Sequence, residues 1–406
     1  MKKYWKFAAI IVVIVLSIGT FHVNSNTSAK QYPEFVIQTQ SGDVNEIKPL
    51  VLEGFYTDTS AMNYVNTNLK ITSDGSTYNS RSFLNQVIGQ PPTMIKELQE
   101  EYRTFMRGKT SQVSSFFEDN QILAYADVDY NIGSLRLRDF KFDISVLSKD
   151  DGNIESFTVE VPDGEKLEDV FVEDVQMVED KLNLITQNMT ENNVDFFYEK
   201  HIYTIDMVNQ KISNHEAIIQ VPEGQDDKRI DVQLIRTSPK KASEHLIFVK
   251  TEKKVVEDKE SKREEVINQE FLSYNLATKE KEKINVSDLR LDENHLSFFD
   301  DSTIYFMTLN GQELLVTPYS LVDDKIGLAF SIPLFGEKDI VYGQMTTVKN
   351  GKLYVASSQM TSDIKGDVIV ADADSGEILF KGQLELKGSS EENNHFELFI
   401  NEMDVN

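Results

Sequence analysis

Short runs of strand-forming residues, separated by turns rich in Asp, Asn and Gly, recur along most of this chain. The clearest case opens with an Asn350-Gly351 turn, which precedes a strand predicted over 352–357. A second strand is predicted over 367–372, and a third begins at Glu377, after the turn Asp374-Ser375-Gly376. β-Branched and aromatic runs bounded by such turns are typical of antiparallel hairpins. The pattern therefore predicts a chain built from short antiparallel strands.

Looser copies of this unit recur upstream. In each copy, a turn rich in acidic or amide residues precedes a β-branched and aromatic strand. The copies lie at Ile122, Leu182, Leu246, Ile304 and Leu353. A strand, a polar turn and another strand follow these copies, except that the copy at Ile304 departs because Asn310-Gly311 turns early. The intervals are close to or longer than the roughly 40 to 50 residues of a propeller blade, and loop insertions would account for the excess.

A unit of four short strands cannot bury both faces of its sheet alone, whereas units arranged radially cover one another. We therefore predict a mainly β protein, a β-propeller of about six to seven four-stranded blades. Stacked antiparallel sandwich domains are the alternative. The C-terminal segment 396–400 is expected to pair with the first unit or to belong to a seventh.

One helix is predicted over 93–107, inserted after the first blade. Pro91 and Pro92 precede Thr93, which is a good N-cap residue, and Gly108 ends the run. Apolar residues fall on one face at helical spacing, namely Met94, Leu98, Tyr102, Phe105 and Met106. We expect this face to pack on the β core rather than to form a partner-binding groove.

The N-terminus combines basic and apolar residues in the order of an export or anchoring segment. Lys2, Lys3 and Lys6 precede an uninterrupted apolar run over 7–16. Basic residues before such a run stay in the cytoplasm, so the rest of the chain is expected outside it. Two interpretations stay open. Residues 4–23 are about as long as a bilayer core requires, and a cleaved signal peptide would use Thr27-Ser28-Ala29 as its cleavage site.

We favour an uncleaved anchor, because the small-residue site is neither strong nor close to the apolar run. The predicted organisation is an anchor over 1–23, a polar tether over 24–32 and an extracytoplasmic domain over 33–406. The protein would then cross the cell membrane once, with the bulk of the chain outside the cytoplasm. It would be secreted if the segment is cleaved.

Charge and composition narrow the classes of partner. The chain of 406 residues is 40% hydrophobic and 27% charged, which is typical of a globular protein. A formal net charge of -26 opposes binding to nucleic acid, because that affinity comes from Lys and Arg meeting phosphates. The lack of cysteine excludes disulfides, thiolate metal sites and a cysteine nucleophile.

The segments Gly351-Lys352-Leu353-Tyr354-Val355 and Asp372-Ala373-Asp374-Ser375-Gly376-Glu377 resemble the repeats of bacterial extracytoplasmic β-propellers, including the YVTN and quinoprotein-like groups. The resemblance implies a fold and not an activity. Quinoprotein propellers carry a docking tryptophan in most blades. The one tryptophan of this chain, Trp5, lies in the N-terminal segment, so no quinone or other cofactor is assigned.

Acidic segments are candidate cation sites. One segment alternates the polar residues Asp127, Asp129 and Asn131, but Ile132 and Arg138 stand where a helix-loop-helix calcium site needs Gly and Glu. On a strand, these alternate side chains would share one half-exposed face. A tighter turn gathers Asp372, Asp374 and Glu377, where Asp is an ordinary turn residue. We assign no metal ligand.

Other candidate residues have equally plain interpretations. The six histidines show no metal-ligand spacing and are expected as separate surface or strand residues: His22, His201, His215, His245, His295 and His395. The mixed-charge stretch 252–265 is expected to form a solvated hairpin or loop. The cluster Phe196, Phe197 and Tyr198 could stack on glycan rings or anchor a protein contact, but we favour a strand entering the core. No nucleophile-elbow, Walker or dinucleotide motif is present, so no catalytic residue is assigned.

These observations favour a non-catalytic, membrane-anchored extracytoplasmic protein that binds another envelope or membrane protein. An extracytoplasmic enzyme acting on glycan or cell-wall material at a propeller mouth is the alternative. A third hypothesis is a cation-dependent adhesion or sensing module. A deep pocket where two carboxylates or several histidines converge would favour an enzyme, and a shallow face of dispersed charge would favour binding.

Overall fold

A computed structural model describes most of the chain outside the N-terminal segment. The described residues are 32–59, 66–78, 91–133, 137–192, 195–220, 228–235, 237–258, 261–286, 295–299, 302–310, 312–334, 343–387 and 395–405. The predicted anchor over 1–23 and residues 24–31 of the tether lie outside them, as do Trp5 and His22. Within the described part, no helix is both long and apolar enough to cross a membrane.

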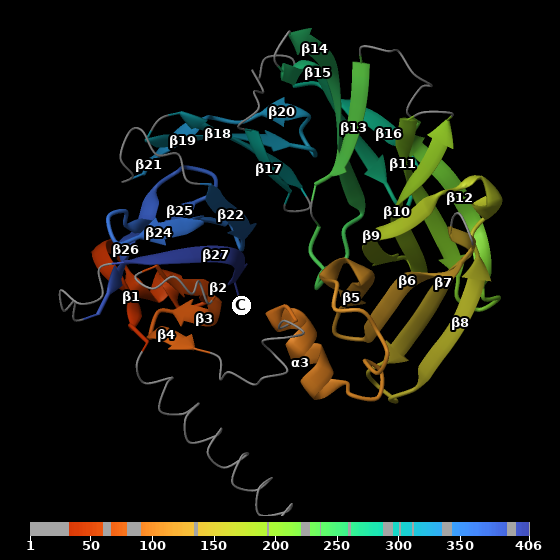
Figure 1. Ribbon diagram of the computed structural model, residues 1–406, viewed down its shortest axis with the longest axis horizontal. Helices are drawn as coiled ribbons and strands as arrows, with labels where there is room; N and C mark the ends of the chain where they lie inside the picture. Colours follow the sequence, from red (N-terminus) through yellow and green to blue (C-terminus); the bar gives the residue numbers. More distant parts are fainter. Residues whose placement is uncertain are drawn as a thin grey trace, which may run out of the picture. The chain divides into compact units, whose positions relative to one another are not determined.

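The described chain is mainly β, as predicted, and its strands form antiparallel sheets of four or five strands (Figure 1). It divides into two compact units. Unit 1 comprises Met1–Gln90, Met307–Pro318 and Gly327–Asn406, and unit 2 comprises Pro91–Phe306 and Tyr319–Ile326.

Unit 2 contains three sheets whose strands follow one another in chain order. The first is β5 (Phe116–Glu118), β6 (Ile122–Ile132), β7 (Leu137–Ser148) and β8 (Ile154–Glu160). The second is β9 (Asp169–Val178), β10 (Lys181–Asn192), β11 (Asp195–Asp206) and β12 (Lys211–Ile219). The third is β13 (Lys228–Leu234), β14 (His245–Asp258), β15 (Ser261–Asn275) and β16 (Lys281–Ile284). Two short 3₁₀ helices, η2 (Val113–Ser115) and η3 (Gly164–Lys166), lie in the same unit.

Unit 1 contains two sheets that combine strands from both ends of the chain. One has the order β1 (Phe35–Gly42), β26 (Ile378–Leu386), β25 (Gly366–Asp372), β23 (Lys352–Ser357) and β22 (Gln344–Lys349). The other has the order β24 (Gln359–Thr361), β27 (Phe396–Val405), β2 (Leu50–Asp58), β3 (Asn66–Thr72) and β4 (Gly75–Tyr78). A 3₁₀ helix, η1 (Val44–Ile47), connects β1 to β2. A further sheet has the order β17 (His295–Phe299), β18 (Thr303–Asn310), β19 (Glu313–Ser320) and β20 (Lys325–Ile326), with β21 (Phe330–Pro333) on β19.

The repeat seen in the sequence corresponds to equivalent strands. Its five copies fall on β6, β10, β14, β18 and β23. Each of the first four pairs with the next strand along the chain, whereas β24 of another sheet lies in the chain between β23 and its partner β25. The hairpin that opens β23 has left-handed backbone at both turn residues, with φ of 54° at Asn350 and 71° at Gly351. This is the geometry that an Asn-Gly turn between paired strands requires. The repeat period therefore identified real structural units.

The predicted helix is shorter than expected. Helix α3 spans Thr93–Glu101 instead of 93–107, because Tyr102 leaves the helical region with φ -116° and ψ 49°. Phe105 and Met106 lie in the turns that follow, yet both are buried. They join Met94 and Leu98 in a core with residues of β5, β6 and β7, so the apolar face packs on the β core as predicted.

The described residues of the mixed-charge stretch, 252–258 and 261–265, form part of the long β14–β15 hairpin, as predicted (Figure 1). Ion pairs link its two strands to each other and to the neighbouring strand β13. Lys253 Nζ lies 2.6 Å from Asp231 and 3.6 Å from Glu264, and Arg229 lies 2.8 Å from Glu264. These partners are partly or largely exposed, so the charges serve solubility more than stability.

Pairing between N-terminal and C-terminal strands closes both sheets of unit 1. Strand β27 pairs with β2 from Leu50↔Val405 to Asp58↔Phe396, and β26 pairs with β1. The segment 396–400 therefore pairs with a strand of the first repeat in the chain, which is one of the two predicted outcomes. A glycine stands at each closure. A Cβ on Gly54 would lie 1.9 Å from the Phe399 carbonyl oxygen, and one on Gly42 would lie 2.1 Å from that of Leu379.

The first prediction tests this close approach. Gly54→Ala should destabilise the protein by about 3 kcal/mol, because the methyl group would meet backbone that cannot rotate away. Gly351→Ala is the control, since its Cβ would meet nothing within 4 Å and only the left-handed φ of 71° opposes it. That strain costs about 1–2 kcal/mol. Thermal unfolding of both variants measures the difference, and equal losses would contradict the close approach at Gly54.

Candidate functional site

A bulge in strand β9 brings two consecutive carboxylates to one cavity. The β9–β10 register pairs Thr186 with Val172 but Ile185 with Asp174, so Glu173 is the extra residue. In a regular strand, neighbouring side chains point to opposite faces. A bulge re-aims them, and both Glu173 and Asp174 line the same cavity.

Glu173 forms an ion pair with a buried lysine. Lys200 on β11 is 1% exposed, and its Nζ donates to Glu173 Oε1 at 2.5 Å and to Gln187 Oε1 at 2.7 Å. Burial lowers the pKa of Lys200, while the Glu173 carboxylate acts against that shift. The second oxygen, Glu173 Oε2, is buried and has no hydrogen-bond partner in the structure. The pair therefore holds a lysine charge inside the unit and leaves one acceptor unused.

Asp174 is bound by neutral groups. Thr237 Oγ1 donates to its Oδ2 at 2.6 Å, and Gln176 Nε2 donates to the same oxygen at 3.0 Å. The Ser243 backbone N–H in turn donates to Gln176 Oε1 at 2.9 Å. These bonds tie the connection between β13 and β14 to β9. Burial raises the pKa of Asp174 to about 7.

The cavity beside β9 has a volume of about 420 Å³. Its walls come from η2, β9, β13 and the segment after β13: Val113, Ser114, Phe171, Glu173, Asp174, Gln233, Leu234, Thr237 and Pro239. Phe171 is 43% exposed, so its ring is available to a ligand. The cavity thus combines apolar walls with two carboxylates.

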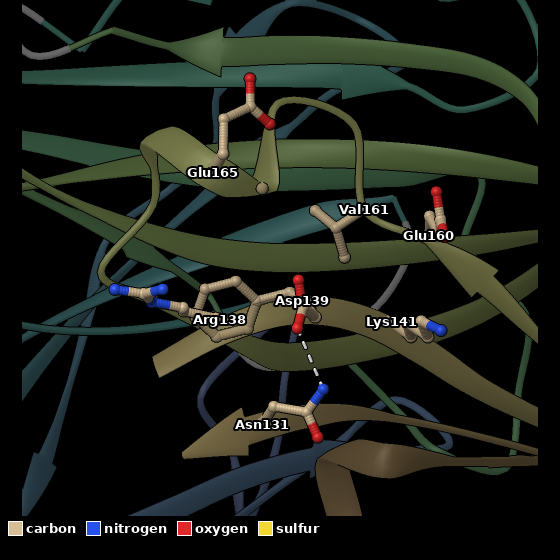
Figure 2. Close-up of a pocket in the computed structure, with 9 residues that line it drawn as sticks. Asn131, Arg138, Asp139, Lys141, Glu160, Val161 and Glu165 are labelled. Atoms are coloured by element: carbon tan, nitrogen blue, oxygen red, sulfur yellow. Dashed lines mark hydrogen bonds between the residues drawn. The ribbon is translucent and has the colours of Figure 1, made fainter. Parts of the chain in front are cut away.

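A second hollow, of about 500 Å³, lies where the β6–β7 hairpin meets η3. Exposed charges of both signs surround it, including Arg138, Asp139, Glu160 and Glu165. Figure 2 shows Asn131 Nδ2 donating to Asp139 Oδ2, at 3.0 Å, while Arg138 and Lys141 point to opposite sides. This is a face of dispersed charge, and we therefore take the cavity beside β9 as the candidate site.

The aromatic cluster found in the sequence lies near the start of β11 and is largely exposed. Phe196 is 55% and Tyr198 46% exposed. This corrects the expectation of a strand entering the core, because these two rings lie beyond the point where the described β11–β12 pairing and the core on this face end. The register pairs Met189 with Tyr198 and Gln187 with Phe171, so Phe171, Met189, Tyr198 and Phe196 share one face. We call these four residues the aromatic stripe.

Farther along β10 and β11, the face that carries the aromatic stripe is covered by residues of another sheet. There, Ile185 and Ile202 belong to a core that includes Leu246 and Phe248 of β14. Beside the stripe, the described pairing of β11 with β12 ends at Lys200↔Ile219, before Tyr198 and Phe196 are reached. The stripe is therefore the exposed continuation of a core-forming face.

The acidic segments serve the local backbone. Asp127 and Asp129 lie on β6 at alternate positions, as expected for a strand, and Asp127 Oδ2 accepts a bond from the Tyr125 hydroxyl at 3.3 Å. Asp372 Oδ1 accepts from Ser375 N at 2.8 Å and from its hydroxyl at 2.7 Å, which closes the turn before β26. In the part of the chain that the structure describes, no three His, Asp or Glu side chains are arranged to hold a metal ion.

Two histidines that we expected to lie apart are in contact. His201 Nδ1 lies 2.7 Å from His215 Nε2, and His201 Nε2 lies 3.1 Å from Glu199 Oε2. The His215 ring stacks on Tyr203 at 4.3 Å. Burial lowers the pKa of both histidines, and for His215 the neighbouring His201 lowers it further. The expectation of isolated histidines is wrong here, because β11 and β12 pair Tyr203 with His215 and so bring His201 beside it.

The other histidines stay apart from this pair. His245 Nε2 lies 3.2 Å from Asn275 Nδ2, and His395 is exposed. The side chain of His295 lies outside the described residues, as does His22.

Comparison with known proteins finds likeness in structure and none in sequence. No family model matches the chain, and no curated protein matches it. Polysaccharide lyase Uly1 is 12% identical, with 70% of this chain and 57% of that chain covered and a TM-score of 0.36. The β-propeller domain of the trilobed protease from Pyrococcus furiosus is 9% identical, with coverages of 85% and 84% and a TM-score of 0.35. Prolyl oligopeptidase B from Galerina marginata is 9% identical, with coverages of 80% and 40% and a TM-score of 0.38.

The chain spans only about half the length of the first solved chains that it resembles, with shares of 57%, 47% and 49%. Two of the similar chains are β-propeller domains, that of the trilobed protease and the Dos1 propeller.

A second prediction concerns the buried lysine. Lys200→Met should lower the free energy of unfolding by about 3–5 kcal/mol, because it leaves the partly buried Glu173 carboxylate without its counter-ion. Adding Glu173→Gln should recover part of that loss, since the remaining carboxamide carries no charge. Lys181→Met is the matched control, because its ion pair with Glu179 is exposed and should contribute at most about 1 kcal/mol. Urea unfolding measures the parent and the three variants, and a Lys200→Met variant as stable as the parent would refute the role of the pair.

A third prediction concerns pH. The pKa values of His201 and His215 are lowered in the folded protein, so the unfolded chain binds protons first as the pH falls. Their contribution to stability is complete above the unfolded pKa of about 6.5 and is lost as the pH falls through the folded pKa values. Glu199 and Asp163 act against this loss, because both carboxylates favour protonated histidine.

The measurement is the midpoint of thermal unfolding between about pH 8 and pH 5. The midpoint should fall less steeply toward acid in the double variant His201→Gln/His215→Gln than in the parent. His395→Gln, which changes an exposed histidine, should leave the slope unchanged. Identical slopes in the parent and the double variant would exclude the histidine pair as the cause.

Proposed function

We propose that this protein is a non-catalytic, membrane-anchored extracytoplasmic protein that binds a protein partner in the bacterial cell envelope. In this proposal the sheets are the blades of a β-propeller of about six to seven blades. Residues 1–23 form the anchor, supported by Lys2, Lys3 and Lys6 ahead of the apolar run over 7–16.

The observation that carries the proposal is the aromatic stripe. Exposed aromatic side chains in a group are the residues that protein interfaces bury at their centres. Phe171, Tyr198 and Phe196 are each between 43% and 55% exposed, and Met189 lies among them on the same face. Burying such rings against a partner would continue the packing that the rest of this face already makes.

Charge around the stripe favours a basic partner. Asp169 is paired with Met189, and Glu191 with Phe196, so both acids lie on the stripe face. The whole chain carries a formal net charge of -26. Complementary charge raises the association rate and rejects acidic competitors, so a partner with exposed Lys or Arg fits this surface best.

The second candidate function is an enzyme acting on glycan. One observation favours it, namely that the cavity beside β9 is lined by two carboxylates, Glu173 and Asp174. Against it, Glu173 is paired with Lys200, and Asp174 is bound by Thr237 and Gln176. Glu173 Oε1 and Asp174 Oδ2 are therefore already bound to other side chains, and binding remains the preferred function.

The experiment places a photoreactive amino acid at position 198 in the full-length chain and irradiates intact bacterial cells. Position 208 is the matched control, because Val208 is 91% exposed on the β11–β12 turn of the same sheet. We expect one reproducible protein adduct at position 198, absent at 208 and lost when Phe171→Ser and Phe196→Ser are added. No adduct, or the same adducts at both positions, would overturn the proposal.

A binding assay separates the alternative. Purified protein is mixed with insoluble cell-wall glycan and sedimented, with and without Phe196→Ser/Tyr198→Ser. Sedimentation that depends on the two rings would assign the stripe to glycan and refute the protein partner, whereas no sedimentation supports the partner.

A further inference from the structure

We propose that the cavity beside β9 receives a basic side chain, Lys or Arg, of the protein partner that docks on the aromatic stripe. This inference rests on the proposed function and adds to it the chemistry of the group that the partner must present.

Phe171 joins the two surfaces. It belongs to the stripe through the register Gln187↔Phe171, and it also forms a wall of the cavity. A partner that covers Tyr198 and Phe196 therefore lies next to the cavity mouth. An aromatic ring at such a mouth attracts a cation over its face.

The cavity has the size and walls for a long basic side chain. Its volume of about 420 Å³ lies within the range of ligand pockets, roughly 300–1,000 Å³. Val113, Leu234 and Pro239 offer apolar surface. Lys and Arg bury their methylene stems against such surface while the charged end reaches a polar group.

The polar end of the cavity suits a cation and opposes an anion. Glu173 and Asp174 both line it. Lys200 offsets the charge of Glu173, so Asp174 is the carboxylate without a basic partner among its hydrogen bonds, which come from Thr237 and Gln176. Glu173 Oε2 is a further acceptor, buried and without a hydrogen-bond partner. An ammonium or guanidinium group would supply the missing donor.

Binding of a cation should depend on the ionisation of Asp174. Its pKa of about 7 reflects burial, with the Glu173 charge as a smaller contribution. An opposite charge nearby favours the ionised carboxylate and lowers its pKa. The cation should therefore displace a proton from Asp174, and affinity should increase as the pH rises through 7.

The test measures the titration of the Asp174 side-chain carboxyl by carbon NMR in the purified full chain. Three probes are compared at millimolar concentration: N-acetyl-lysine methylamide, N-acetyl-arginine methylamide and the neutral N-acetyl-norleucine methylamide. We expect both basic probes to lower the titration midpoint, by about one pH unit. The norleucine probe should leave it unchanged. An unchanged midpoint with all three probes, or the same shift with norleucine, would overturn the inference.

A variant confirms the location. Asp174→Asn should weaken binding of the lysine probe at least about tenfold. Asp206→Asn, which changes a partly exposed acid at the end of β11 and outside the cavity lining, should leave binding unchanged. Equal effects of the two variants would place the cation outside the cavity. The photo-crosslink at position 198 reports on the stripe alone, so an intact crosslink with failed amine binding refutes this inference and leaves the proposed function standing.

Discussion

The pairing of the first strands with the last holds unit 1 together. Both of its sheets contain strands from the two ends of the chain, and Gln40 meets Gln383 across 343 residues of sequence. Such contacts carry the loop-closure cost of nearly the whole chain before they form. The core that these contacts form is aromatic. The ring centroids of Phe35 and Tyr56 lie 5.5 Å and 6.2 Å from the ring centroid of Phe396. Unit 1 therefore cannot assemble before the C-terminal strand is made.

Unit 2 depends on a different constraint, a buried polar network that fixes strand register. Thr186 donates to Asn188 at 2.8 Å, and Asn188 donates to the Tyr203 hydroxyl at 2.9 Å, all three buried. A slip of one residue between β10 and β11 would turn these groups to the other face and strand them. Because the hydrogen bonds of this network can all form in just one register, the network favours that register. The same pairing sets the positions of Lys200 and His201, so the site inherits its geometry from the network.

Local sequence patterns predicted what local physics decides. The turn at Asn350-Gly351, the repeat copies and the apolar face of α3 all follow from turn chemistry and side-chain period, and the structure contains them. The candidate site could not be predicted in this way. Asp174 meets Thr237 across 63 residues, and no spacing rule connects them. The contact of His201 with His215 could have been found by writing out the β11–β12 hairpin, because a cross-strand register places them diagonally.

The bulge at Glu173 explains why the site lies on β9. In a regular strand without the bulge, Glu173 and Asp174 would point to opposite faces of the sheet. The face of Asp174 would then meet the core that contains Val172 and Val175, where an ionised carboxylate has no partner. With the extra residue, one carboxylate meets Lys200 and the other meets Thr237, and both reach the cavity. The bulge thus makes β9 a polar wall, because it places two carboxylates of this strand on one side of the cavity. It does so beside Phe171, the ring that begins the exposed stripe, which makes the polar wall and the stripe parts of a single surface.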